Sequence, residues 1–93
     1  MLELTILYDY YSELLTDKQR EYFEDYYFSN LSLQEIAENN NISRNAVHKS
    51  LKEITSKLKY YEEKLKLYEK SKEINKLIEN IDENIKTKIR ELI

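Results

Sequence analysis

The sequence contains no glycine and no proline among its 93 residues, and it also lacks cysteine and tryptophan. Hairpins and many tight turns depend on glycine and proline, and the alternation that is typical of strands is absent as well. These absences argue against a β-sheet protein and predict an all-α fold. A chain of this length forms one small domain, or a smaller domain with an appended element.

The absence of cysteine excludes disulfides, a thiol nucleophile and a cysteine-bound metal. The single histidine, His48, cannot build a zinc site without several carboxylates, and no such cluster accompanies it in the sequence. There is also no phosphate-binding loop and no nucleophile with an adjacent base. We therefore expect neither a cofactor nor an enzymatic activity.

Long apolar runs are missing too. No stretch approaches the roughly 20 residues that a membrane-spanning helix needs. The first residues lack the basic start and apolar run of a secretory signal. The sequence therefore predicts a cytoplasmic protein that does not insert into a membrane.

Charge is present but unevenly distributed. The net charge of the chain is −3, yet residues 1–31 carry a net charge of −5 and residues 43–59 a net charge of +4. An acidic total weighs against strong nucleic-acid binding. An acidic front and a basic middle can nevertheless orient a protein on a polyanion, so the distribution matters more than the sum.

Hydrophobic periodicity predicts two helices before residue 31. The first covers residues 2–15, and its apolar surface is wider than one small neighbour needs, so part of it is expected to face a second chain. The second follows Thr16, which can form a Thr-x-x-Gln capping box with Gln19. It runs to about residue 28 and carries an aromatic cluster: Phe23, Tyr26, Tyr27 and Phe28.

Residues 32–58 have the pattern of a helix-turn-helix. Ser32 and Glu35 can form a capping box at the start of a short helix. The run Asn39–Asn41 then predicts a turn, because asparagine tolerates the left-handed backbone conformation. Ile42 is expected to be an apolar plug, and Ser43 caps a second, longer helix. The inward face of that helix repeats at steps of four, three and four residues: Val47, Leu51, Ile54 and Leu58.

The outward face of the second helix carries residue types that read nucleic acid. Arginine can form paired hydrogen bonds with guanine, asparagine does so with adenine, and lysine neutralises phosphate. This is the face of a helix-turn-helix that enters a major groove, although a solvated helix face without a ligand is the alternative. The candidate base-reading residues are Arg44, Asn45, His48, Lys49 and Lys52, and the candidate phosphate contacts are Lys57 and Lys59.

The nine tyrosines allow a second interpretation. Tyr60 and Tyr61 lie close to several lysines and could stack on the bases of single-stranded RNA. We favour a place for the tyrosines in the core or in an interface, with their hydroxyl groups in contact with water. DNA is therefore the expected partner, and RNA is the alternative.

The helical rhythm continues through residues 63–93, with an interruption expected at Lys70–Lys72. A stripe of apolar residues over roughly 19 positions follows from residue 74, and such a stripe is typical of a seam between paired helices. The pattern leaves open whether residues 59–93 form one helix or two. We divide the chain into a helical domain, residues 1–62, and a C-terminal extension, residues 63–93, that is expected to form a homodimer. The alternative is that the C-terminal helices fold back on the bundle of their own chain. The expected interface residues are Ile74, Leu77, Ile81, Ile85 and Leu92.

Several short stretches carry a resemblance to known families. They are Leu15-Thr16-x-x-Gln19-Arg20, Tyr26-Tyr27, Leu31-Ser32-Leu33-x-Glu35-Ile36-Ala37-Glu38 and Ile42-Ser43-Arg44-x-x-Val47. These stretches resemble region 4 of bacterial sigma factors. Over about residues 1–70 the chain is most similar to the small YlxM family of helix-turn-helix proteins, which bacteria encode beside signal recognition particle genes.

The resemblance implies a fold and a function. The fold would be a sigma-region-4-like tri-helical bundle with extended C-terminal helices. The function would be that of a DNA-binding regulatory protein that acts in, or regulates, the signal recognition particle pathway. The alternative is a non-catalytic adaptor that docks components of that pathway without reading DNA.

Overall fold

The computed structural model describes residues 2–93, and all regular structure in that part of the chain is helical. The predicted all-α fold is confirmed. The elements are α1 (Leu2–Tyr11), the 3-10 turn η1 (Ser12–Leu14), α2 (Asp17–Tyr27), α3 (Leu33–Asn40), α4 (Arg44–Leu65), α5 (Leu67–Leu77) and α6 (Glu83–Leu92).

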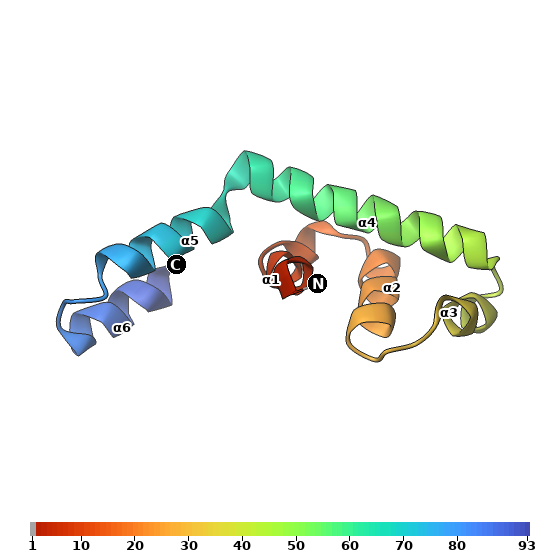
Figure 1. Cartoon of the computed structure of the whole chain (residues 1–93), viewed down its shortest axis with the longest axis horizontal. Coiled ribbons are helices and arrows are strands. Elements are labelled where there is room, and N and C mark those ends of the chain that lie inside the picture. Colours follow the sequence, from red (N-terminus) through yellow and green to blue (C-terminus); the bar gives the residue numbers. More distant parts are fainter. Residues whose placement is uncertain (1) are drawn as a thin grey trace.

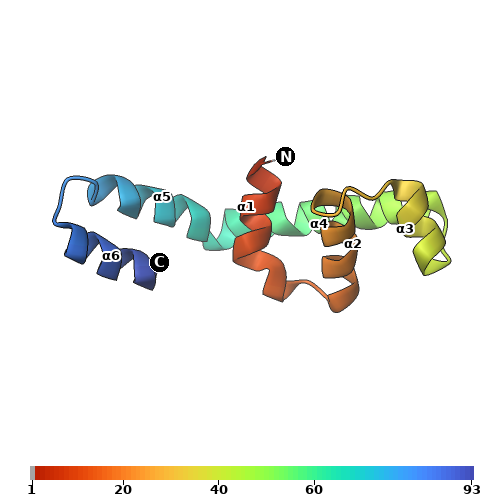
Figure 2. The same ribbon diagram turned by 90° about the horizontal axis from the view of Figure 1, so that it is seen from below.

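Helix α4 is the long axis around which the other helices are arranged (Figure 1). Helices α1, α2 and α3 pack along one side of it, and α5 and α6 continue beyond its C-terminal end. Seen from below, α5 and α6 lie side by side at one end of the molecule and α3 lies at the other (Figure 2). The molecule is accordingly elongated, at 53 × 25 × 20 Å. We refer to α1–α4, residues 2–65, as the core region and to residues 67–92 as the C-terminal hairpin.

The core region is built on the predicted inward face of α4, all four of whose apolar residues are buried. Burying an aliphatic side chain of this size contributes about 1.5–3 kcal/mol. Ala37 of α3 is also buried, and its small side chain lets α3 approach α4 closely. The buried partners come from three helices: Leu7 and Tyr11 of α1, Phe23 of α2, and Ile36 and Ala37 of α3.

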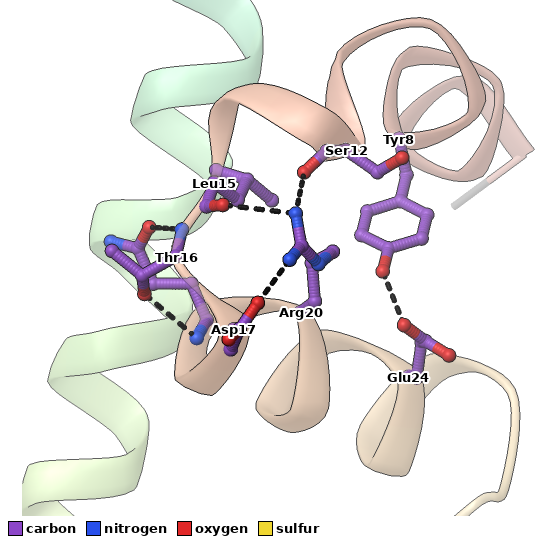
Figure 3. A network of polar contacts seen from close by, with 8 residues as sticks. Tyr8, Ser12, Leu15, Thr16, Asp17, Arg20 and Glu24 are labelled. Carbon is purple, nitrogen blue, oxygen red and sulfur yellow. Dashed lines mark hydrogen bonds and ion pairs between the residues drawn. The ribbon is translucent and has the colours of Figure 1, made fainter.

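The connection between α1 and α2 is held by Arg20 (Figure 3). Its guanidinium group donates hydrogen bonds to the backbone carbonyl oxygens of Ser12 (3.0 Å) and Leu15 (3.1 Å), and it also pairs with the carboxylate of Asp17. The helix predicted over residues 2–15 is α-helical only as far as Tyr11, and the 3-10 turn η1 follows it.

Helix α2 begins at the predicted capping box. The N–H of Gln19 donates to the Thr16 hydroxyl oxygen (3.1 Å), and the N–H of Thr16 donates to the Gln19 side-chain oxygen (2.9 Å). Further along, the Tyr8 hydroxyl of α1 donates a 2.5 Å hydrogen bond to Glu24 (Figure 3), and the Tyr8 ring stacks on Phe23 with centroids 4.3 Å apart. Burial and the Glu24 carboxylate raise the pKa of Tyr8, so its hydroxyl remains a donor at neutral pH.

The chain changes direction at Lys66, the single residue between α4 and α5. Lys66 has a left-handed backbone conformation, with φ of 55°. The predicted interruption at Lys70–Lys72 is wrong, because these residues lie within α5. The predicted boundary between residues 62 and 63 falls inside α4.

A small hydrogen-bond network, which we call the Glu62 joint, explains the position of the break. The Glu62 carboxylate accepts hydrogen bonds from the backbone N–H groups of Tyr68 (3.1 Å) and Glu69 (3.0 Å), and so caps the start of α5. The Tyr11 hydroxyl donates to the same carboxylate (2.5 Å) and accepts from the N–H of Leu67 (3.1 Å). Because these N–H groups have partners from α4 and α1, a new helix can start there.

The C-terminal hairpin replaces the continuous stripe predicted for residues 74–92. That prediction is wrong, because α5 ends at Leu77 and α6 begins after Asp82. The Asp82 side chain accepts a hydrogen bond from the N–H of Asn84 (2.9 Å), which makes Asp82 the N-cap of α6. Residues 59–93 thus comprise the end of α4 and two further helices.

Candidate nucleic-acid interface

The turn between α3 and α4 sets the direction of the candidate recognition helix. Ser32 and Glu35 form the predicted capping box at the start of α3. Asn41 ends α3 in the left-handed conformation with φ of 53°, which confirms the predicted asparagine turn. The Ser43 hydroxyl oxygen then accepts a 3.0 Å hydrogen bond from the N–H of Ala46 and caps α4. This arrangement is a helix-turn-helix.

Ile42 differs from its prediction as an apolar plug. Its side chain is 36% exposed. Its backbone carries the structural role instead, because the N–H of Ile42 donates to the carbonyl oxygen of Ala37 (3.1 Å) and closes the C-terminal end of α3. A tight turn thus holds the two helices together without burying the side chain at its centre.

The five predicted base-reading residues are all exposed in the first half of α4. Within residues 2–93 the ion pairs involve only the cations of Lys18, Arg20 and Lys86, so the cations of this face form no direct ion pair, although Glu53 lies beside Lys49 and Lys52. The face is therefore available to an anionic partner. Its members are Arg44, Asn45, His48, Lys49 and Lys52, which we call the α4 face.

Two hollows border the α4 face. Lys49 and Lys52 line a hollow on the outer side of α4, which Lys57 also lines. His48 and Lys52 line a second hollow, between α2 and α4. Arg44 and Asn45 lie outside both, at the N-terminal end of α4. Of the α4 face, His48 thus lines one hollow, Lys49 lines the other, and Lys52 lines both.

The two predicted phosphate contacts lie further along α4 and differ from each other. The Lys57 ammonium group donates a 3.4 Å hydrogen bond to the side-chain oxygen of Gln19, at the start of α2. Lys59 is exposed, and its ammonium group has no hydrogen-bond or ion-pair partner among residues 2–93. The Lys57 side chain is thus linked weakly to α2, whereas that of Lys59 extends into solvent.

The hollow between α2 and α4 contains two residues that the sequence interpretation assigned to the core or an interface. Tyr26 and Tyr27 are only half-buried, and both line this hollow together with Leu33 of α3. Both tyrosines also pack against the buried cluster, so the predicted place in the core holds for part of each ring and the rest of each ring lines the hollow.

The five predicted dimer-interface residues do not form one stripe. Ile74 and Leu77 lie on α5, Ile81 lies in the turn, and Ile85 and Leu92 lie on α6. Ile74 is half-buried, whereas Leu77 and Leu92 are 82% and 85% exposed. The hairpin thus exposes apolar side chains from both of its helices and from the turn between them.

Two further observations on the described residues concern membranes and metal ions. No helix among residues 2–93 is long and apolar enough to cross a membrane. The same residues contain no group of three or more histidine, cysteine, aspartate or glutamate side chains arranged to hold a metal ion.

The helix-turn-helix geometry and the helical order agree with a known protein family. The family described as "Putative helix-turn-helix protein, YlxM / p13 like" matches residues 1–92. The chain belongs to the YlxM/p13-like family. The predicted resemblance is thereby confirmed, and it extends beyond residue 70 to include the C-terminal hairpin.

Relatives in the YlxM/p13-like family come from diverse bacteria. A UPF0122 protein of Caldanaerobacter subterraneus subsp. tengcongensis is 53% identical over 84 residues, which cover 90% of this chain and 72% of the relative. A UPF0122 protein of Malacoplasma penetrans is 43% identical over 96 residues, which cover 97% and 90%. A third, from Fusobacterium nucleatum subsp. nucleatum, is 41% identical over 83 residues, which cover 89% and 81%.

Proposed function

We propose that this chain is a DNA-binding regulatory protein whose α4 face enters the major groove. The observation that carries the proposal is the exposed α4 face, whose cations form no direct ion pair, in the first half of the second helix of a capped helix-turn-helix. In helix-turn-helix proteins the N-terminal residues of the second helix contact base edges. Arg44 and Asn45 occupy those positions here, and Lys49 and Lys52 follow them toward the phosphates.

The number of cations argues for binding by two copies. Each phosphate contact contributes a salt-dependence slope of about 0.9, and four contacts from one chain give weak binding at cellular salt. A homodimer would double them. The exposed apolar side chains of the C-terminal hairpin, with those of Leu2 and Leu14 on the core region, are the surfaces that support such a dimer.

The proposal is tested by measuring binding to duplex DNA by fluorescence anisotropy over a series of salt concentrations. The double variant Arg44→Ala, Lys49→Ala is expected to bind at least tenfold more weakly, with a salt slope lower by about 2 per chain. The matched control is Lys70→Ala, Lys76→Ala, which removes the same charge from exposed positions on α5. Equal losses of DNA affinity in the two double variants would rule out the α4 face as the binding site.

A second function is favoured by the acidic surface of α2. Burial raises the pKa of Asp25, and the charges of Glu21 and Glu24 raise it further. A cluster of like charges of this kind is relieved when a basic surface docks on it. The chain would then be an adaptor in the signal recognition particle pathway that does not read DNA.

The two functions are separated by nuclease treatment. A tagged chain is used to capture signal recognition particle components from a bacterial lysate, with and without nuclease. Capture of the targeting GTPase after nuclease treatment, lost in a variant with Glu21→Gln and Glu24→Gln, would support the adaptor. Capture that depends on intact nucleic acid would support the DNA-binding regulator.

A further inference from the structure

A hollow of about 310 Å³ lies between the C-terminal part of α2 and the middle of α4. Helices α2 and α3 contribute Tyr26, Tyr27 and Leu33, and α4 contributes Lys52 and Thr55. Sites for small ligands have volumes of roughly 300–1,000 Å³, and this hollow is at the lower end of that range. Its size suits one flat ring better than an extended ligand.

The wall of the hollow is aromatic and well anchored. The ring centroid of Tyr27 lies 4.5 Å from the ring centroid of Phe23, and Phe23 is fully buried. The ring of Tyr26 is perpendicular to that of Tyr27, at 89° with centroids 5.0 Å apart. Aromatic side chains of this kind stack on unpaired nucleobases, because every base has a π-face.

The polar groups of the hollow come from α4. His48 and Lys52 provide nitrogen donors, and Thr55 and Ser56 provide hydroxyl groups. None of the residues that line the hollow is acidic. The combination of an aromatic wall with a cation and several hydrogen-bonding groups suits a planar, polar-edged ring attached to an anionic chain.

The hollow is continuous with the outer side of α4. The second hollow is lined by Lys49, Glu53 and Lys57, and the two hollows share Lys52 and Ser56. A phosphate backbone that follows the lysines of the outer hollow therefore passes the shared rim at Lys52 and Ser56. A base attached at that point would face the hollow that Tyr26 and Tyr27 line.

We propose that the hollow between α2 and α4 binds one unpaired base of a nucleic acid whose backbone lies on the α4 face. The proposal rests on the proposed function, because the α4 face supplies the backbone contacts. Bases within a duplex are stacked on both faces and offer only their edges. A base that has left the stack offers the face on which a tyrosine ring stacks, and unstacking costs least where the base has no pairing partner.

The test compares three duplexes of the same sequence: fully paired, with a single-nucleotide bulge, and with the same bulge lacking its base. Anisotropy titrations are expected to give about tenfold tighter binding to the bulge that carries a base than to either of the others. The bulge without a base controls for the bending and flexibility that any bulge introduces. DNA and RNA versions of the three duplexes distinguish the two sources of the same base-and-phosphate chemistry.

Variants of Tyr26 test whether the preference comes from this hollow. Tyr26→Ala is expected to abolish the preference for the bulged base, and Tyr26→Phe is expected to keep it because the ring remains. The matched control is Tyr60→Ala, since Tyr60 is an exposed tyrosine of α4 outside the hollow. Tyr26→Leu preserves apolar volume and replaces Tyr26→Ala if circular dichroism shows that the alanine variant is unfolded.

Each outcome decides the proposal. Equal affinity for the three duplexes would overturn the base-binding hollow and leave the DNA-binding function intact. A preference that survives Tyr26→Ala and Tyr26→Leu but is lost in Tyr60→Ala would also overturn it. No binding to any duplex would overturn both the hollow and the proposed function. A base-dependent preference that is lost only in the Tyr26→Ala and Tyr26→Leu variants supports the proposal.

Discussion

The core region and the C-terminal hairpin differ in how much apolar surface their own chain covers. In the core region the buried side chains form one continuous cluster drawn from four helices. In the hairpin only Ile78 is buried, and the neighbouring Leu77 is almost fully exposed. Both regions have apolar residues at three- and four-residue steps. Periodicity therefore predicts which side of a helix is apolar, but it does not predict what covers that side.

Helix length adds to the contrast. Helix α4 has 22 residues and packs against three other helices, whereas α5 has 11 residues and α6 has 10. Isolated helices shorter than about 12–15 residues are marginal in water. The hairpin is therefore expected to depend on the Glu62 joint, on the packing of Tyr68 against Tyr10 of α1 and on a second copy, and the core region is expected to be stable by itself.

The largest change in the free energy of unfolding is expected from a matched pair of side-chain truncations, one in each region. Ile54→Ala removes a fully buried side chain and should lower the free energy of unfolding by about 3 kcal/mol. Ile85→Ala removes a side chain that is 52% exposed in one chain and should cost less than about 1 kcal/mol at protein concentrations where the chain is monomeric. Urea unfolding measures both.

The protein concentration should affect the two truncations differently. If the hairpins pair, the cost of Ile85→Ala should grow with protein concentration, whereas that of Ile54→Ala should grow far less, because association stabilises the folded state by mass action. A concentration-independent cost at both positions would contradict pairing through α6.

The next largest effect concerns the assembly. Ile81→Glu together with Ile85→Glu places two charges on the exposed apolar surface of the hairpin and should convert a homodimer into an 11.4 kDa monomer. The core region should remain folded, with a thermal midpoint changed by less than about 4 °C, since neither side chain is buried. Size exclusion with light scattering and thermal unfolding measure the two quantities. If the wild-type chain is monomeric at micromolar concentration, the predicted homodimer is ruled out.

A smaller effect should appear at the Glu62 joint, where the two regions meet. Burial alone would raise the pKa of Glu62, but the hydrogen bonds from Tyr11 and from the N–H groups of Tyr68 and Glu69 outweigh it and lower the pKa below its ordinary value of 4.5. A carboxyl group with a lowered pKa stabilises the fold at pH above its unfolded value, and this contribution is lost as the pH falls through the folded value. We expect Glu62→Gln to cost about 1 kcal/mol at neutral pH.

The absence of cysteine permits a direct measurement of the joint. Spin labels on Lys59→Cys in α4 and Lys88→Cys in α6, both exposed positions, report the distance between the two regions. The distance distribution should broaden in Glu62→Gln, and it should broaden in the parent as the pH falls through the lowered pKa of Glu62. Glu63→Gln is the matched control, because Glu63 is exposed and takes no part in the joint. Equal distributions in the two variants would show that the joint does not hold the hairpin.

The smallest effect is expected at two left-handed residues, Lys66 between the two regions and Asn41 in the core region. Lys66→Gly should stabilise the chain by about 0.5–1 kcal/mol, because glycine adopts a positive φ without the steric cost that a lysine side chain carries. Asn41→Gly should gain only a few tenths of a kcal/mol, since asparagine tolerates this conformation. Urea unfolding of both variants makes the comparison. A larger gain at Asn41 than at Lys66 would contradict this account of the two turns.

Local interactions made much of the core region predictable. Ser32 with Glu35, and Thr16 with Gln19, satisfy helix N-termini within three residues, so the sequence pattern contains the whole interaction. The inward face of α4 was equally predictable, because its spacing is that of one helix face. The candidate reading face follows directly, as the opposite side of the same helix.

The missed features depend on distant partners. Nothing near Lys66 marks it as a helix break, since the cap comes from Glu62 and from Tyr11 at the other end of the chain. The tyrosine hollow likewise requires the crossing of α2 and α4. The break between α5 and α6 is the one missed feature with a local signal, because Asp82 is a good N-cap residue and could have been recognised as one.

Lys66 and the Glu62 joint also make the hairpin a lever. Helix α5 reaches about 16 Å from the joint, so a rotation of about 10° there moves its far end by about 3 Å. In a pair of chains joined through their hairpins, such a rotation would change the separation of the two helix-turn-helix motifs without altering either one. In such a pair the spacing between the motifs and the chemistry of their candidate reading faces would be set by different residues, and each could vary while the other stayed fixed.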